Sequence, residues 1–303
     1  MTARKALATG LRAARQRPLL VLGIFGIDVV LSWLATLPFH QTFASATEMR
    51  PFADPLAGGL KLDILSEVFA RRPDVMTAGQ AGALAGTLAW IVLNWFLVAG
   101  VMGLLREPVE AATFRRFGAE AAAHGFAMMR LQLWSLPAYL VAAIVIWIGG
   151  MIGYAIGSNA INPWITVVTV GLGVLPGLFV WLVVATAVDV ARARTVLLAE
   201  RAMLSTLFDS LRQVRRNPRA LIGVQVLGGL LWIGITVLHV LATWPFQFSS
   251  IVGLAIFMLI RQLTVLLRHG VRIGSLGATL EVVRATAPSA GATELVPATA
   301  GVN

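Results

Sequence analysis

The chain contains six apolar stretches, each long enough to cross a lipid bilayer as a helix. Crossing takes about 20 mostly apolar residues at about 1.5 Å per residue. Mean hydropathy is +0.82 and only 13% of residues are charged, so a water-soluble fold of this length is excluded. We expect an all-α polytopic bundle over residues 1–284 and a disordered tail over 285–303. The predicted spans are 19–39, 80–105, 131–157, 163–188, 220–241 and 249–267.

The basic residues are distributed unevenly between the segments that join these spans. All but four of the 24 Lys and Arg residues fall on the side that receives both termini. The four exceptions are Arg50, Lys61, Arg71 and Arg72. Because cytoplasmic loops carry an excess of Lys and Arg, we predict a multi-pass protein of the bacterial inner membrane with both termini in the cytoplasm. The first span is longer than the apolar part of a signal peptide, so we expect it to remain uncleaved.

A net charge of +10 raises the question of which anionic partner the chain meets. The Arg residues flank apolar runs, which favours anionic lipid headgroups and not nucleic acid. Three basic segments, 3–16, 111–129 and 196–213, carry apolar residues at helical spacing and are predicted to lie on the cytoplasmic membrane surface. The residues expected to contact headgroups are Arg12, Arg15, Arg17, Arg212, Arg215 and Arg216.

Two of the basic segments resemble each other. Residues 11–19 read LRAARQRPL, residues 211–219 read LRQVRRNPR, and an apolar span follows each. Pro18 and Pro218 suit the start of a membrane helix, because proline lacks an N–H and has a restricted φ. Both copies run in the same direction, so any repeat is parallel. A parallel repeat weakens the case for alternating access of the inverted-repeat kind.

The longest segment outside the bilayer is the outer loop 40–79. Asp54-Pro55 resembles a helix start and Arg72-Pro73 a helix stop, which predicts an amphipathic helix over 55–71. We expect this helix to rest on the outer membrane surface or to cap the bundle. The alternative is a lid or a docking helix for a partner.

Small residues recur every four positions in three of the spans. Such spacing lets membrane helices approach closely, so we interpret these glycines as packing ridges that also offer surfaces for self-association or for other membrane proteins. The ridges are Gly149, Gly153 and Gly157, then Gly173 and Gly177, then Gly82 and Gly86.

A few polar residues lie deep within the predicted spans. Asp28 falls near the midplane, where an unpaired carboxylate is costly, and Arg261 is predicted to pair with it as a structural clamp or as a proton or ion relay. Asn94 and Gln225 are expected to form hydrogen bonds between helices. We interpret Asp189 as one half of an ion pair with the residue three positions later, Arg192, at the inner end of its span.

The residues that carry common enzymatic chemistry are scarce. The chain has no Cys, and it contains no phosphate-binding loop, no Ser/His/Asp arrangement and no metal-ligand spacing. His40 and His239 alone are weak evidence for a haem or metal site. We therefore expect no enzymatic activity, no metal and no cofactor.

Several short motifs resemble those of a broad group of uncharacterised six-span bacterial inner-membrane proteins. More loosely, the chain is similar to the membrane domain attached to some glycerophosphodiester phosphodiesterases, although it has no phosphodiesterase domain. The resemblance implies a helical bundle and no particular activity. The motifs that carry it are Arg17-Pro18, LDIL at 62–65, DVAR at 189–192, Asn217-Pro218, and Gln262 with Arg268.

Two functions remain open from the sequence. The favoured one is a scaffold or accessory subunit of a larger membrane complex. The alternative is a transporter or channel for a small molecule or lipid, with Asp28 and Arg261 at the bundle centre. A transporter should have a cavity that reaches Asp28, whereas a scaffold should have a filled core and an apolar lateral groove.

Overall fold

The computed structural model describes residues 1–47, 62–109, 113–160, 162–244 and 251–286. Within these ranges the chain is helical and has no strand, which confirms the all-α prediction. The helices are α1 (Ala3–Arg15), α2 (Pro18–Thr47), α4 (Leu62–Arg71), α5 (Pro73–Arg106), α6 (Phe114–Gly157), α7 (Pro163–Leu198), α8 (Met203–Arg216), α9 (Pro218–Thr243) and α10 (Ile251–Thr286).

Six of these helices, α2, α5, α6, α7, α9 and α10, are long and apolar enough to cross a membrane. They contain the described parts of all six predicted spans, so the protein is a multi-pass membrane protein. The boundaries differ most at the end of α10, which continues to Thr286, and at the start of α6, which is a single helix of 44 residues. The predicted surface helix at 111–129 is therefore wrong as a separate element, because from residue 114 it is the first part of α6. No proline lies between residues 114 and 130 to stop the helix before the apolar stretch begins, and the helix also continues past Pro137 within that stretch.

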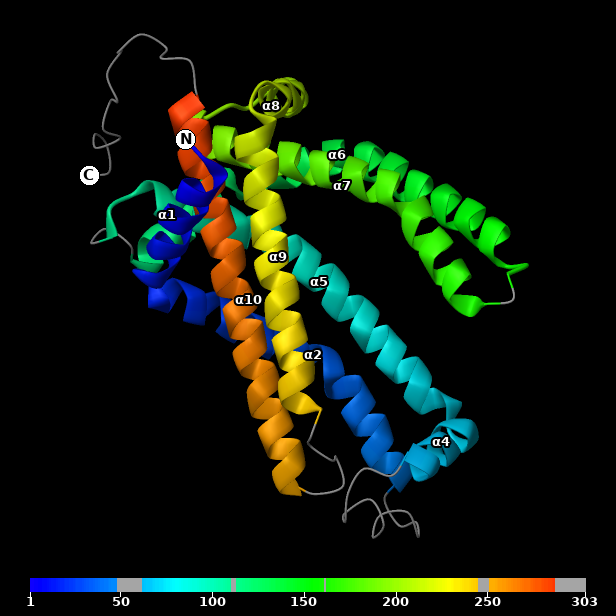
Figure 1. The fold of residues 1–303 in the computed structure, drawn as a ribbon. Coiled ribbons are helices and arrows are strands. Elements are labelled where there is room, and N and C mark those ends of the chain that lie inside the picture. Colours follow the sequence, from blue (N-terminus) through cyan, green and yellow to red (C-terminus); the bar gives the residue numbers. More distant parts are fainter. Residues whose placement is uncertain (48–61, 110–112, 161, 245–250, 287–303) are drawn as a thin grey trace.

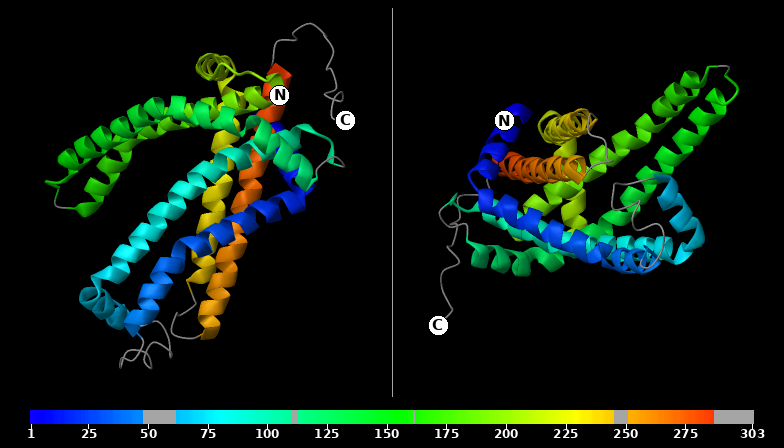
Figure 2. Two further views of the ribbon diagram at one scale, coloured as in Figure 1. Left: turned by 180° about the vertical axis from the view of Figure 1, so that it is seen from behind. Right: turned by 90° about the horizontal axis from the view of Figure 1, so that it is seen from below.

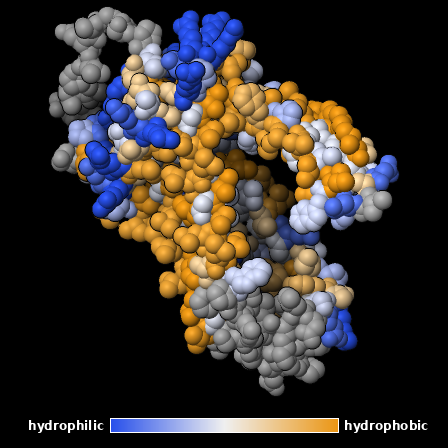
Figure 3. All heavy atoms as spheres, in the orientation of Figure 1, coloured by the Kyte–Doolittle hydropathy of each residue, from blue (hydrophilic) through white to orange (hydrophobic). Residues whose placement is uncertain are grey.

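The six long helices form three hairpins that diverge from a common base. The hairpins are α2 with α5, α6 with α7, and α9 with α10, and Figures 1 and 2 show them spreading from the end that holds α1 and α8. We call this the basal end. The α6–α7 hairpin leaves the base in a different direction from the other two, and Figure 3 shows an open hollow between it and the rest of the molecule.

The best-packed part of the molecule lies at the basal end. Residues 98–104 of α5, 186–193 of α7 and 273–280 of α10 are all buried. Ala6 and Leu7 of α1 join the same core. Because only the second helix of each hairpin contributes a long buried stretch, the three hairpins are joined at their bases and separate along most of their length.

Each hairpin is preceded by a helical segment that packs at the base against the second helix of another hairpin. Helix α1 lies on α10, where Gly10 meets the backbone of Gly274 and Ala278. The start of α6 lies on α5, where Glu120 covers Gly103. Helix α8 lies on α7. These contacts form a ring. The start of α6 and helix α8 each pack on the hairpin that precedes them in the chain, and α1 packs on the α9–α10 hairpin. The parallel repeat seen in the sequence therefore has a structural counterpart with three units.

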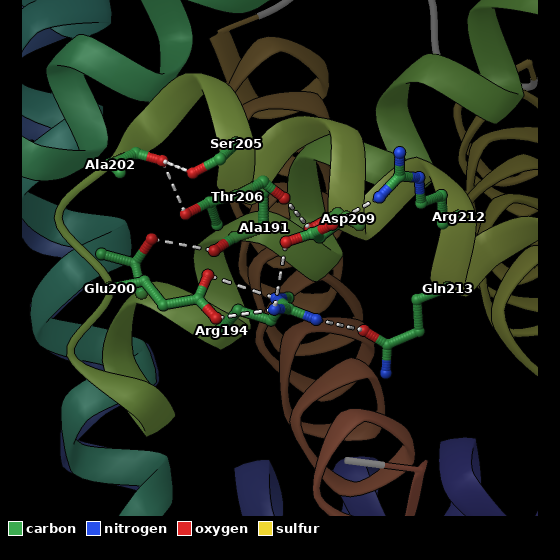
Figure 4. Close-up of polar contacts among 11 residues, drawn as sticks. Ala191, Arg194, Glu200, Ala202, Ser205, Thr206, Asp209, Arg212 and Gln213 are labelled. Carbon is green, nitrogen blue, oxygen red and sulfur yellow. Dashed lines mark hydrogen bonds and ion pairs between the residues drawn. The ribbon is translucent and has the colours of Figure 1, made fainter. Parts of the chain in front are cut away.

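The turn between α7 and α8 is held by a polar cluster (Figure 4). Arg194 donates from Nη2 to Glu200 Oε1 at 2.6 Å and from Nε to Glu200 Oε2 at 3.2 Å. Its Nη1 donates to Gln213 Oε1 on α8 at 3.4 Å. Ala199 ends α7 in the left-handed region, with φ of 51°. These contacts seat the basic helix α8 against α7.

The predicted glycine ridges are confirmed as packing surfaces. Gly149 and Gly173 face each other so closely that a Cβ on either would meet the carbonyl of the other. A Cβ on Gly82 of α5 would meet the carbonyl of Ala35 of α2, and a Cβ on Gly86 would meet the Cβ of Ala35. The ridges are thus used within the α6–α7 and α2–α5 hairpins, and their part in self-association or in contacts with other membrane proteins stays a prediction.

Helix α4 covers the outer end of the α2–α5 hairpin. Val68 of α4 is buried together with Ala46 and Val75, which supports the capping position predicted for this helix. The stop at Arg72-Pro73 is confirmed, whereas residues 55–61 of the predicted helix lie outside the described residues. Exposed Arg72 donates hydrogen bonds to Asp74, and these raise the pKa of its guanidinium. The predicted tail lies outside the described residues from 287 onward.

Candidate intramembrane binding site

A cavity of about 610 Å³ lies between α2, α5, α9 and α10, near the point where the hairpins diverge. Much of its wall is apolar, with Ile24, Trp90, Leu97 and Trp232 among the lining residues. Polar side chains from all four helices also face it, and they are Asp28, Asn94, Gln225, Arg268, His269, Arg272 and Ser275. The cavity reaches Asp28.

One end of the polar wall is built on Asp189 of α7, which is 3% exposed. It accepts hydrogen bonds from Arg192 at 2.8 Å, from both terminal nitrogens of Arg272 at 3.0 and 3.2 Å, and from Gln225 at 2.8 Å. Arg192 in turn donates to Gln132 at 2.6 Å. The network joins α6, α7, α9 and α10, and a carboxylate so well paired can stay charged at this depth.

Two sequence predictions are confirmed in this network, and two of its members were missed. The pair of Asp189 with Arg192 is present, and Gln225 does bond between helices. Arg272 and Gln132 were not predicted. Arg272 lies beyond the predicted end of the sixth span, so it was counted among the cytoplasmic charges. Asp189 itself could have indicated Arg272, because a carboxylate at this depth that has only one cationic partner on its own helix is expected to pair with a second cation from another helix.

The predicted pair of Asp28 with Arg261 is wrong. His269 lies opposite Asp28 instead, with Nε2 3.4 Å from Oδ2. Arg261 is exposed and lies eight residues earlier on α10, or about 12 Å toward the outer end. The prediction assumed that the helix leaves the membrane near residue 267. Because α10 continues to Thr286, the residue at the depth of Asp28 is His269, eight residues farther along the chain than Arg261.

Arg268 is the cation whose charge the cavity wall compensates least. Its guanidinium carbon lies 4.3 Å from the ring centroid of Trp232, and Nη2 donates to Thr236 Oγ1 at 2.8 Å. Its Nε is buried and has no acceptor among the described residues. Within the same described ranges no carboxylate oxygen lies within 4.0 Å of it. A cation held by a ring and a hydroxyl keeps most of its capacity to bind an anion.

The charges around the cavity leave a positive surplus. The carboxylates are Asp28 and Asp189, whereas Arg192, Arg268 and Arg272 are always protonated. Two of the three guanidinium groups are used by Asp189. Electrostatic interactions are strong where water is excluded. The positive charge of the third guanidinium, that of Arg268, therefore favours an anionic group in the cavity.

The basic residues predicted to contact headgroups mostly lie where that role requires. Arg12 and Arg15 of α1 and Arg212, Arg215 and Arg216 of α8 are exposed at the basal end, where Figure 3 shows hydrophilic residues gathered. Arg17 differs, because only 7% of it is exposed. It donates to the carbonyls of Ala13 at 3.3 Å and Glu107 at 2.6 Å, which ties the start of α2 to the end of α5.

Among the residues that the structure describes, no group of three or more His, Asp or Glu side chains is placed to hold a metal ion. His239 instead contacts Thr264 Oγ1 at 3.1 Å through Nδ1. No family model, no curated protein and no solved structure matches this chain. The resemblance to six-span inner-membrane proteins therefore stays a prediction, and the function must be argued from the cavity.

Proposed function

We propose that this protein binds an anionic amphiphile in the central cavity and carries it within or across the membrane, without converting it chemically. The observation that carries the proposal is Arg268, a half-buried cation in the cavity wall whose buried Nε lacks an acceptor among the described residues. A carboxylate or phosphate would supply both the charge and the missing acceptor. The scaffold function favoured by the sequence would leave this cation unexplained.

The apolar part of the ligand follows from the rest of the wall. Trp90, Leu97 and Trp232 offer contact to a hydrocarbon group beside the charged end of the cavity. A second cavity of about 400 Å³ shares Asp28 and Trp90 with the first and continues between α2 and α5. An elongated molecule with one charged end can therefore lie across both cavities.

The test uses 9,10-dibromostearate, whose bromine atoms quench nearby tryptophans, and protein reconstituted in nanodiscs. Trp90 and Trp232 line the cavity, so we expect saturable quenching by the acid and only partition-dependent quenching by its neutral methyl ester. Arg268→Gln should weaken binding of the acid about tenfold or more, because a charge-assisted hydrogen bond contributes about 1.5–3 kcal/mol. Arg284→Gln, at an exposed basal position, serves as the control.

A variant that fills the cavity separates binding there from binding elsewhere. Gly229 lines the cavity, and a Cβ at this position meets nothing within 4 Å, so Gly229→Phe should abolish saturable quenching without disturbing the fold. Gly234→Phe adds the same side chain elsewhere on α9, also into open space, and should bind normally. Equal quenching by acid and ester, or normal binding by Gly229→Phe, would contradict the proposal.

A second candidate function, an accessory subunit of a larger complex, rests on the α6–α7 hairpin. Trp147, Ile148 and Ile152 of α6 are exposed, and the hairpin projects away from the other two (Figures 1 and 2). A partner membrane helix could cover such a face. A protein that binds no dibromostearate but co-purifies in mild detergent with another membrane chain would favour this function.

The orientation that we propose, basal end in the cytoplasm of a bacterial inner membrane, rests on the basic residues of α1 and α8. Since the chain has no Cys, single cysteines report it directly. Ser158→Cys, in the exposed α6–α7 turn, should react with a membrane-impermeant maleimide in intact spheroplasts. Ser205→Cys, exposed on α8, should react only after permeabilisation. The reverse pattern would overturn the proposed orientation.

A further inference from the structure

A groove apart from the two cavities described above lies on the side of α2 near its start. It has a volume of about 490 Å³ and is bounded by α2, the end of α5 and the start of α6. Only Ile24 lines both this groove and the central cavity, so Ile24 forms part of the wall between them. We call it the basal groove.

The basal groove is polar at one end and apolar along the rest. Gln16, Arg17 and Thr113 lie at its basal end. Leu20, Gly23, Ile24 and Ile27 follow along one face of α2, and Leu104 and Phe117 form the opposite wall. From Pro18 to Ile27 the helix rises about 14 Å, which is close to the thickness of one leaflet of the hydrocarbon core. The dimensions fit one acyl chain.

The polar end of the groove carries positive charge. Arg17 lines it, and exposed Arg15 and Arg115 lie beside lining residues of α2 and α6. The nearby acid, Glu107, has its carboxylate 3.5 Å from Arg106 and 3.3 Å from Arg116, so it is already compensated. Guanidinium groups bind phosphate strongly.

We propose that the basal groove binds one anionic phospholipid from the leaflet at the basal end. One acyl chain lies along α2 between Leu20 and Ile27, and the phosphate lies at the basal end of the groove, near exposed Arg15 and Arg115. Gly23 leaves room for the chain, because a Cβ at this position meets nothing within 4 Å. The site is distinct from the central cavity and does not depend on the function proposed for it.

The test measures lipid binding to the purified full-length protein by native mass spectrometry, with dioleoylphosphatidylglycerol and zwitterionic dioleoylphosphatidylcholine as the two lipids. The wild type should retain one phosphatidylglycerol in preference to phosphatidylcholine. Gly23→Phe fills the groove and should weaken this binding about tenfold. Gly26→Phe adds the same side chain one turn along α2, also into open space and outside the groove, and should bind as the wild type does.

Two further arms complete the test. Arg115→Gln should reduce the preference for phosphatidylglycerol by up to about fivefold, because an exposed charge contributes modestly. Inorganic phosphate should not compete, since it lacks the acyl chain. Equal binding by Gly23→Phe and Gly26→Phe, equal affinity for the two lipids, or competition by inorganic phosphate would overturn the proposal.

Discussion

Asp189→Asn is expected to destabilise the protein by about 3 kcal/mol, because it leaves buried Arg192 and the cavity-lining Arg272 without their counter-ion. Asparagine keeps the size of the side chain, so the effect reports charge and not a cavity. Thermal unfolding in detergent, followed by tryptophan fluorescence, should show a midpoint lower by roughly 10 °C or more.

A matched exposed pair and a rescue sharpen this test. Glu281 pairs with Arg284 at 3.0 Å on the surface of α10, and Glu281→Gln should cost no more than about 1 kcal/mol. Arg272→Gln added to Asp189→Asn should recover part of the lost stability, because it removes one of the stranded charges. If Asp189→Asn and Glu281→Gln shift the midpoint equally, the network does not hold the base together.

Gly173→Leu is expected to break the α6–α7 hairpin. Any Cβ at this position meets the carbonyl of Gly149 and approaches the Cα of Gly153, and backbone atoms cannot move aside as a flexible side chain can. We expect a loss of about 3 kcal/mol or more, seen as a fall in the yield of monodisperse protein on size exclusion and in the midpoint of thermal unfolding.

Gly171→Leu is the natural control for this variant. Gly171 lies on the same helix two residues earlier, and a Cβ there meets nothing within 4 Å. The same side chain should therefore change the yield little, since it points into space that lipid fills. Similar losses for both variants would mean that α7 tolerates no added bulk anywhere, and the close contact of the two helices would not be the cause.

The existence of six long helices could be predicted from sequence, because apolar length alone determines which segments can cross a bilayer. The glycine ridges were predictable for a similar reason, since spacing by four places Gly149 and Gly153 on one face of a helix. Helix ends were harder to predict. In α10 the apolar signal fades near residue 267, yet the helix continues because nothing in 268–286 stops it.

The candidate site was predictable only where one helix carries the whole signal. Asp189 and Arg192 are neighbours on α7, so spacing revealed their pair. Arg272 reaches the same carboxylate from 83 residues away, and His269 reaches Asp28 from 241 residues away. Such contacts depend on how far each helix extends past the membrane and how the hairpins rotate about one another. A single sequence contains neither quantity.

The ring of basal contacts has a consequence for how the protein is made. Helix α1 is synthesised long before α10, yet the surface it packs on belongs to α10. Until α10 has been synthesised, Ala6, Leu7 and Gly10 have no native partner there, and the apolar face of α1 must rest on the membrane surface. Assembly of the base therefore waits until α10 has been synthesised, and a chain cut short before residue 273 would lack the contact that closes the ring.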